Sequence, residues 1–152
     1  MTWGVKTEIA VGFAAWRVGQ GDGDVILHIK TDNMIPQPGA LPYHAWLVSG
    51  NYIIDFTTYQ LKEKARLLDN MDGGNTQVDW CPQYLLEQTA RSRTINDVTQ
   101  LNAGMFNYTR DLGLEKKILS KSRPMAHEDL VQLRIIYANP EIEVINTRIK
   151  LK

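Results

Sequence analysis

The sequence predicts an α+β domain in which an antiparallel sheet of four to five strands packs against helices. The first third of the chain is rich in apolar and aromatic segments separated by turn residues, and later segments place apolar residues at helical spacing. Strands that come first and helices that follow are typical of α+β folds rather than of a doubly wound parallel sheet. With 152 residues, 43% of them hydrophobic, we expect a single domain over 1–152.

The first half supplies most of the predicted strands. Breaks rich in glycine or proline lie at 19–24 and 32–42, and the second of these is predicted to be a surface loop. The strands between and after them are predicted over 10–18, over 25–30, and as a central hairpin over 43–57 that turns at Ser49-Gly50-Asn51.

Helical periodicity dominates the rest of the chain. Leu61, Ala65 and Leu68 share one face of a helix predicted over 59–70, and Asp72-Gly73-Gly74-Asn75 ends it. Further helices are predicted over 83–90, 94–108 and 125–139, with a linker at 120–124 and a late strand over 141–151.

Composition excludes several classes of partner. Lys plus Arg and Asp plus Glu number 17 each, so the formal charge of zero gives no reason to expect nucleic acid or an anionic membrane. No apolar run approaches the roughly 20 residues of a membrane span, and the first residues lack a signal-peptide pattern, so we expect a cytoplasmic protein. One cysteine and three histidines, without CxxC or HExxH spacing, predict no metal site and no cofactor.

The hairpin carries a histidine and an aspartate between apolar neighbours. A Ser49-Gly50 turn would place His44 directly opposite Asp55, and a Gly50-Asn51 turn would place them diagonally on one face. A three-residue loop would send them to opposite faces. Two interpretations remain open. His44 and Asp55 satisfy each other's hydrogen bonds as a polar pair within the sheet, or Asp55 orients His44 as a base.

The segment HAWLVSGNYIIDFTTYQ, with His44, Trp46, Asp55 and Thr57, resembles the His…Asp hairpin of the papain-like and transglutaminase-like cysteine proteinase superfamily. The resemblance extends over about residues 10–60, whose surroundings look like those of a group of uncharacterised bacterial and phage-borne members. The resemblance implies that His44 is the base and Asp55 its orienting residue. It also implies a thiol-dependent hydrolysis or transfer at an amide or ester carbonyl, with a protein or peptide as substrate.

The nucleophile of that superfamily has no match. Its cysteine begins a helix that precedes these strands, whereas no cysteine precedes His44 here. Either the chain lacks an N-terminal helical segment, or this member has lost the chemistry. Cys81 is a substitute if Pro82 begins a helix whose dipole lowers the thiol pKa, but it follows the hairpin. The simpler expectation is a small buried residue beside Trp80 and distant from His44.

Two other features have simpler interpretations. Gly19-Gln20-Gly21-Asp22-Gly23-Asp24 suggests a phosphate or calcium loop but lacks the residues of either, so a turn is expected. His28 would join His44 and Asp55 as a zinc ligand if the sheet placed them together, although ordinary packing of a strand histidine is the more common case.

Together these observations predict a papain-like or transglutaminase-like domain that keeps the His44–Asp55 pair. The alternative is a non-enzymatic binding or interaction module on the same fold. If a helix is missing, one face of the sheet should expose an apolar patch, which predicts a homodimer.

Overall fold

The computed structural model describes residues 6–29, 40–90, 94–100, 103–124, 126–138, 142–145 and 148–151. The chain forms two compact units, Met1–Leu119 and Ser120–Lys152. The expectation of one domain over 1–152 stays a prediction.

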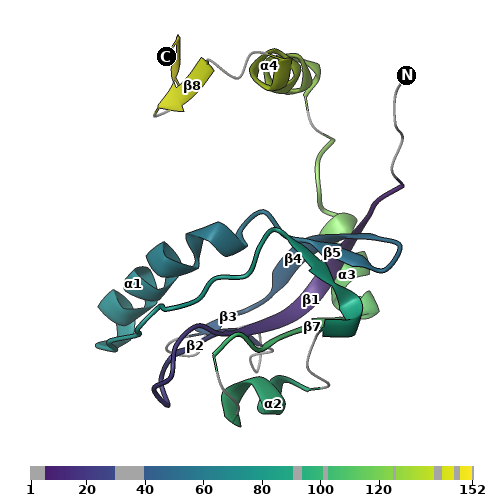
Figure 1. Ribbon diagram of the computed structural model, residues 1–152. Helices are drawn as coiled ribbons and strands as arrows, with labels where there is room; N and C mark the ends of the chain where they lie inside the picture. The colour runs from purple at the N-terminus through teal and green to yellow at the C-terminus, as the bar shows by residue number, and fades with distance from the viewer. Residues whose placement is uncertain are drawn as a thin grey trace. The chain divides into compact units, whose positions relative to one another are not determined.

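A seven-stranded sheet is the centre of the first unit (Figure 1). Its strands are β1 (Glu8–Arg17), β2 (Val25–His28), β3 (Ala40–Leu41), β4 (His44–Ser49), β5 (Tyr52–Ile54), β6 (Leu85–Glu87) and β7 (Phe106–Arg110). The order is β3-β2-β1-β4-β5-β6, with β7 paired to β1, and among the described strands the short β2–β3 pair is parallel and the others are antiparallel. The hairpin β4–β5 is therefore central, as predicted.

Strand β1 is paired along both of its edges. Gly12 pairs with His44 of β4 and also with β7, and Ala14 pairs with His28 of β2 and also with β7. Because a strand has only two edges, β7 runs along one of them while β2 and β4 follow one another along the other. The end of β2 and the start of β4 therefore bring the two histidines together.

One face of the sheet is covered by α1 (Leu61–Asp72), which follows the short 3-10 helix η2 (Thr58–Gln60). Its buried residues are those that the helical spacing predicted, Leu61, Ala65 and Leu68, and Gly73 ends it with a φ of +79°. These side chains pack on apolar residues of five strands: Ala10, Ala14, Trp16, Ile26, Trp46, Ile53, Phe106 and Tyr108.

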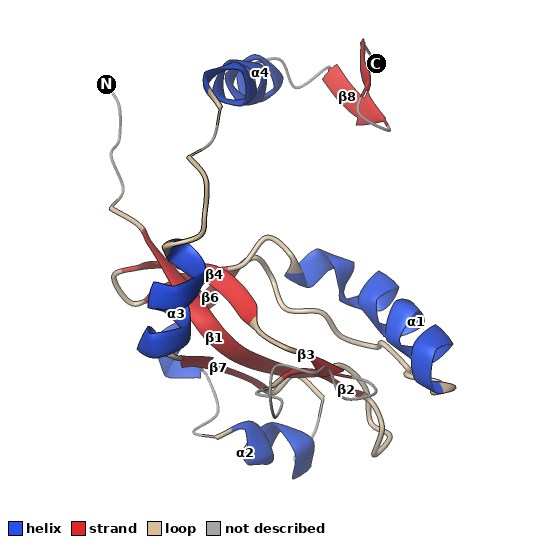
Figure 2. Ribbon diagram, turned by 180° about the vertical axis from the view of Figure 1, so that it is seen from behind, coloured by secondary structure: helices blue, strands red, loops and turns tan. Residues whose placement is uncertain are grey.

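The opposite face carries α2 (Ile95–Gln100) and α3 (Leu112–Leu119), which pack on β1. Figures 1 and 2 show α1 and α2 on opposite sides of the sheet. Val11 and Ala15, which alternate with the residues under α1, are fully buried, and so is Val98 of α2. The long strand β1 is thus covered on both faces, which explains why it is apolar on both.

The turn at 19–24 is a structural turn, as expected. The Asp24 carboxylate accepts hydrogen bonds from the backbone N–H groups of Gly21 at 2.7 Å and Gln77 at 2.8 Å. Its oxygens are therefore engaged in holding two loops together.

The second unit contains α4 (His127–Ala138) and a hairpin of β8 (Ile142–Ile145) and β9 (Arg148–Leu151). The predicted helix over 125–139 is confirmed, and the single late strand is a hairpin. Among the described residues, no helix has both the length and the apolar character needed to cross a bilayer.

The α+β class is confirmed, but one predicted helix is wrong and another is shorter than predicted. Residues 83–90 contain β6 and the 3-10 helix η3 (Gln88–Ala90), because Leu86 pairs with Ile53 of β5. The helix over 94–108 stops at Gln100, and Phe106 begins β7. Pairing with distant strands decides both segments, and it adds strands to the predicted four to five. Most of the loop predicted over 32–42 lies outside the described residues.

Candidate functional site

The hairpin turn selects the register of the candidate site. Ser49 pairs with Tyr52, so Gly50 and Asn51 form a two-residue turn, and Gly50 has the positive φ of +55° that such turns require. This is the diagonal one of the two registers that place His44 and Asp55 on one face. His44 begins β4, and Asp55 directly follows β5.

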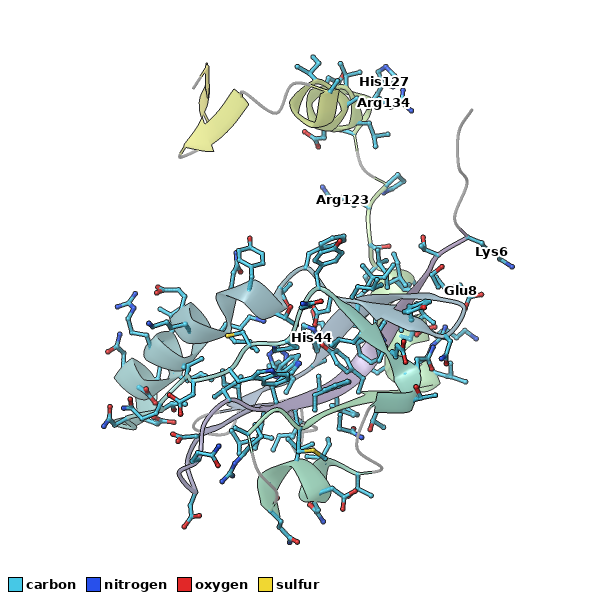
Figure 3. The ribbon with its side chains drawn as sticks, in the orientation of Figure 1. Lys6, Glu8, His44, Arg123, His127 and Arg134 are labelled. Atoms are coloured by element: carbon cyan, nitrogen blue, oxygen red, sulfur yellow. The ribbon has the colours of Figure 1, made fainter. Side chains whose placement is uncertain are left out.

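The two side chains meet. The Nε2 atom of His44 lies 2.7 Å from Oδ2 of Asp55, and the residues are 5% and 2% exposed. Figure 3 shows His44 among the side chains between α1 and the sheet. The contact predicted from the hairpin is therefore confirmed, while the role of the pair stays a prediction.

Asp55 accepts hydrogen bonds on both carboxylate oxygens. Its Oδ1 accepts from the backbone N–H of Thr57 at 2.9 Å and from the Thr57 hydroxyl at 2.8 Å, and its Oδ2 accepts from the Tyr108 hydroxyl at 2.8 Å. Burial alone would raise the pKa of Asp55, but the hydrogen bonds from His44 and Thr57 lower that pKa to about 2. Asp55 is therefore a carboxylate at neutral pH.

A charged Asp55 fixes the tautomer of His44. An ionised carboxylate only accepts hydrogen bonds, so Nε2 of His44 must donate, and Nδ1 of the neutral ring then carries a lone pair. The His44 ring stacks on the Trp46 ring, with centroids 6.1 Å apart, and meets the Trp16 ring edge-on, with centroids 5.1 Å apart. These contacts hold the imidazole in place. Chemically, the arrangement is that of an oriented base.

Tyr108, Trp16 and Thr57 complete the site, and none was assigned a role from the sequence. The Trp16 indole N–H donates to the Tyr108 hydroxyl at 3.0 Å, which in turn donates to Asp55. The alternation of β1 could have placed Trp16 on the face of the hairpin residues. Tyr108 had no such signal, because its segment was predicted to be a helix.

His28 lies beside His44, as the zinc hypothesis required, with ring centroids 4.6 Å apart and ring planes at 82°. Its Nδ1 donates to the Tyr43 carbonyl at 2.9 Å, so its buried Nε2 is an acceptor, and it has no hydrogen-bond partner among the residues that the structure describes. Burial and the neighbouring His44 lower the pKa of His28 to about 3, which keeps the ring neutral. Within the described ranges, no three His, Cys, Asp or Glu residues are grouped to hold a metal ion.

A lysine of α1 also reaches this cluster. The Lys64 ammonium donates to the Thr57 hydroxyl at 3.2 Å and lies 5.7 Å from the centre of the Trp16 ring. Its partial burial lowers the pKa of Lys64, and the charge of Asp55 acts in the opposite direction. The first turns of α1 therefore bring a positive charge to the pair.

Cys81 differs from both sequence interpretations. It is exposed rather than buried, and Pro82 begins no helix, because β6 follows instead. Partial desolvation raises the pKa of the Cys81 thiol, and the backbone N–H and charge of Lys62 oppose that rise. The net effect is a raised thiol pKa, which disfavours the thiolate that a nucleophile needs.

Two recesses of about 230 Å³ each lie near the pair: Asp55 lines one of them, and its hydrogen-bond partner Tyr108 lines the other. One is lined by Trp46, Val48, Ile53, Gln88, Tyr108 and Arg110. The other is mostly apolar and is lined by Ile9, Ala45, Trp46, Leu47, Ile54, Asp55, Phe56 and Thr57. A larger cavity of about 440 Å³ lies at the far end of α1 and includes neither residue of the pair.

Comparisons with known proteins address the fold. No family model matches the sequence, and no curated protein matches it. The crystal structure of a protein described only as a genomics target is similar, with a TM-score of 0.52 and 21% identity, over 78% of this chain and 51% of that one. At this identity the likeness shows the fold alone. The chain spans about half the length of the protein it matches.

Proposed function

We propose that His44 and Asp55 are the base and orienting residue of a papain-like or transglutaminase-like site. The reaction is a thiol-dependent hydrolysis or transfer at an amide or ester carbonyl. One observation carries the proposal: the 2.7 Å contact between Nε2 of His44 and a carboxylate whose hydrogen bonds keep it charged. This geometry leaves Nδ1 as the basic atom, ready to take a proton from a thiol.

The proposal supplies a base but no nucleophile. Cys81, the one cysteine of the sequence, is a poor candidate because its thiol pKa is raised. In an enzyme of this kind the attacking thiol has to lie on the Nδ1 side of His44. An added small thiol that reaches Nδ1 of His44 therefore takes the place of the missing cysteine in a test.

The test is acyl transfer from p-nitrophenyl acetate to cysteamine. We expect the protein to accelerate thiol-dependent release of nitrophenolate, and His44→Gln to lower that rate by about 100-fold, the lower range for a general base. Asp55→Asn should also lower it, because the tautomer is no longer fixed. Cys81→Ser should leave the rate unchanged, and iodoacetamide should alkylate Cys81 equally fast with and without His44.

His127→Gln is the matched control, since His127 is exposed on α4 and any imidazole catalyses this ester weakly. Equal rates for the wild type, His44→Gln and His127→Gln would refute the base role. A strong dependence on Cys81 would instead make that residue the nucleophile.

The second candidate is a binding or interaction module on the same fold. It is favoured by exposed aromatic side chains next to the pair: Phe56 and Tyr84, each 58% exposed, stack with ring centroids 5.7 Å apart. In that case the pair only stabilises the sheet. The His44→Gln protein would then differ from the wild type in stability and not in acyl transfer.

A further inference from the structure

We propose that Tyr108, held by Trp16, is a positioning residue that limits the strength of the hydrogen bond between His44 and Asp55. Its importance for catalysis rests on the proposed function, whereas the hydrogen bond itself does not. The observation behind it is that two donors share one oxygen. Oδ2 of Asp55 accepts from Nε2 of His44 at 2.7 Å and from the Tyr108 hydroxyl at 2.8 Å.

The direction of each hydrogen bond is fixed by chemistry. An indole N–H can only donate, so Trp16 occupies a lone pair of the Tyr108 oxygen, and the hydroxyl hydrogen is left for Asp55. Burial, together with the charge of Asp55, raises the pKa of Tyr108 far above its ordinary value, so the phenol stays protonated. Trp16 and Tyr108 are 0% and 1% exposed, which excludes bulk water from these positions.

Tyr108 is far from Asp55 in the sequence, whereas Thr57 is its near neighbour. Thr57 follows Asp55 by two residues, and its hydrogen bonds form the local turn that an aspartate at the end of a strand commonly makes. Tyr108 belongs to β7 and reaches Asp55 only because β7 pairs with β1. The Tyr108 hydroxyl is not needed for that local turn. An effect on the strength of the hydrogen bond between His44 and Asp55 is therefore the more specific explanation.

His44 and Tyr108 compete for the negative charge on Oδ2 of Asp55. Each donor to Oδ2 withdraws part of the negative charge that the other donor uses, and the Trp16 hydrogen bond polarises the Tyr108 hydroxyl into a better donor. Removal of the hydroxyl should therefore strengthen the remaining bond from His44. Tyr108 thus helps to hold the Asp55 carboxylate in place while restraining the pull of Asp55 on the Nε2 proton of His44.

The test is the proton NMR resonance of the His44 Nε2–H group, assigned by its loss in His44→Gln. In Tyr108→Phe we expect this resonance to move downfield, as the bond to Asp55 becomes stronger. Tyr84→Phe is the matched control, since Tyr84 is exposed, and it should leave the resonance in place. An unchanged, upfield-shifted or missing resonance in a folded Tyr108→Phe protein would overturn the proposal.

A second measurement applies if Tyr108→Phe does not fold. Incorporation of 3-fluorotyrosine keeps the shape of the side chain and makes the phenol a stronger donor, so the same resonance should move upfield. A downfield or absent shift overturns the proposal. A failure of the proposed function would be distinguishable, because acyl transfer would then be independent of His44 while these shifts could still be measured.

Discussion

At the scale of single residues, the site depends on the buried negative charge of Asp55. A carboxylate that is 2% exposed is costly unless its oxygens are hydrogen-bonded, and here both are. One donor is His44, which acquires a fixed tautomer from the contact. The hydrogen bonds that offset the burial of Asp55 therefore include the one that fixes the tautomer of His44.

His28 makes stability depend on pH. Its pKa is lowered from 6.5 to about 3, so between these values the unfolded chain binds more protons than the folded one. The free energy of unfolding should therefore fall as pH drops from about 6.5 toward 3, by up to about 1.4 kcal/mol per pH unit. Asp55 has a lowered pKa and acts in the same direction, but only below about 3.8.

Urea unfolding between pH 7 and pH 4.5 isolates the contribution of His28. His28→Phe, which keeps an aromatic ring in contact with Trp16 and His44, should show a smaller loss of stability with acidification than the wild type. His127→Phe, at an exposed position on α4, should keep the wild-type dependence. Identical pH dependence in all three proteins would contradict the assignment to His28.

At the level of elements, β1 organises the site. It pairs with β4, β2 and β7, which carry His44, His28 and Tyr108. Gly12 lies where β4 and β7 meet β1 from opposite edges. A Cβ atom there would collide with the Thr109 carbonyl oxygen and would lie 2.9 Å from Cα of Arg110, so the backbone of β7 would have to move.

Gly12→Ala should therefore lower the free energy of unfolding by about 1–3 kcal/mol, the usual cost of overpacking. Because β7 carries Tyr108, the same substitution should shift the His44 Nε2–H resonance. Gly23→Ala is the matched control, since a Cβ atom there meets nothing within 4 Å. Chemical denaturation of the two variants checks the prediction, and equal stability would show that β7 accommodates the methyl group.

At the level of the whole molecule, the first unit leaves apolar side chains exposed around one recess. Ile9 is 49% exposed and Phe56 is 58% exposed, and both line the apolar recess beside the pair. Exposed apolar patches commonly mark surfaces that another molecule covers. The patch is consistent with the homodimer expected from the sequence, and we retain that expectation as a prediction.

Sedimentation velocity over a range of concentrations checks the predicted homodimer. We expect a dimer in the wild type and a shift toward monomer in Phe56→Lys. Met71→Lys, at a position of α1 that is 78% exposed and outside the recess, should sediment like the wild type. A wild-type monomer at the highest concentration would exclude the dimer.

Local patterns in the sequence determined much of this protein. Apolar spacing placed α1 and its buried residues, a glycine ended that helix, and a two-residue turn brought His44 and Asp55 to one face. These features depend on neighbours within about fifteen residues. Helical periodicity and hairpin register are set by residues that are close in the sequence, so local patterns predict them.

The tertiary structure alone decided the rest. Strands β6 and β7 form because distant strands supply their hydrogen-bonding partners, so local propensity misassigned both as helix. The same long-range pairing brings Tyr108 to Asp55 across 53 positions of the chain. The sequence by itself limited the hairpin to a few registers, most of which bring His44 and Asp55 to one face, and the structure has one of these. The packing of β7 against β1 decided which other side chains hold them, because no local pattern encodes contacts between strands so far apart.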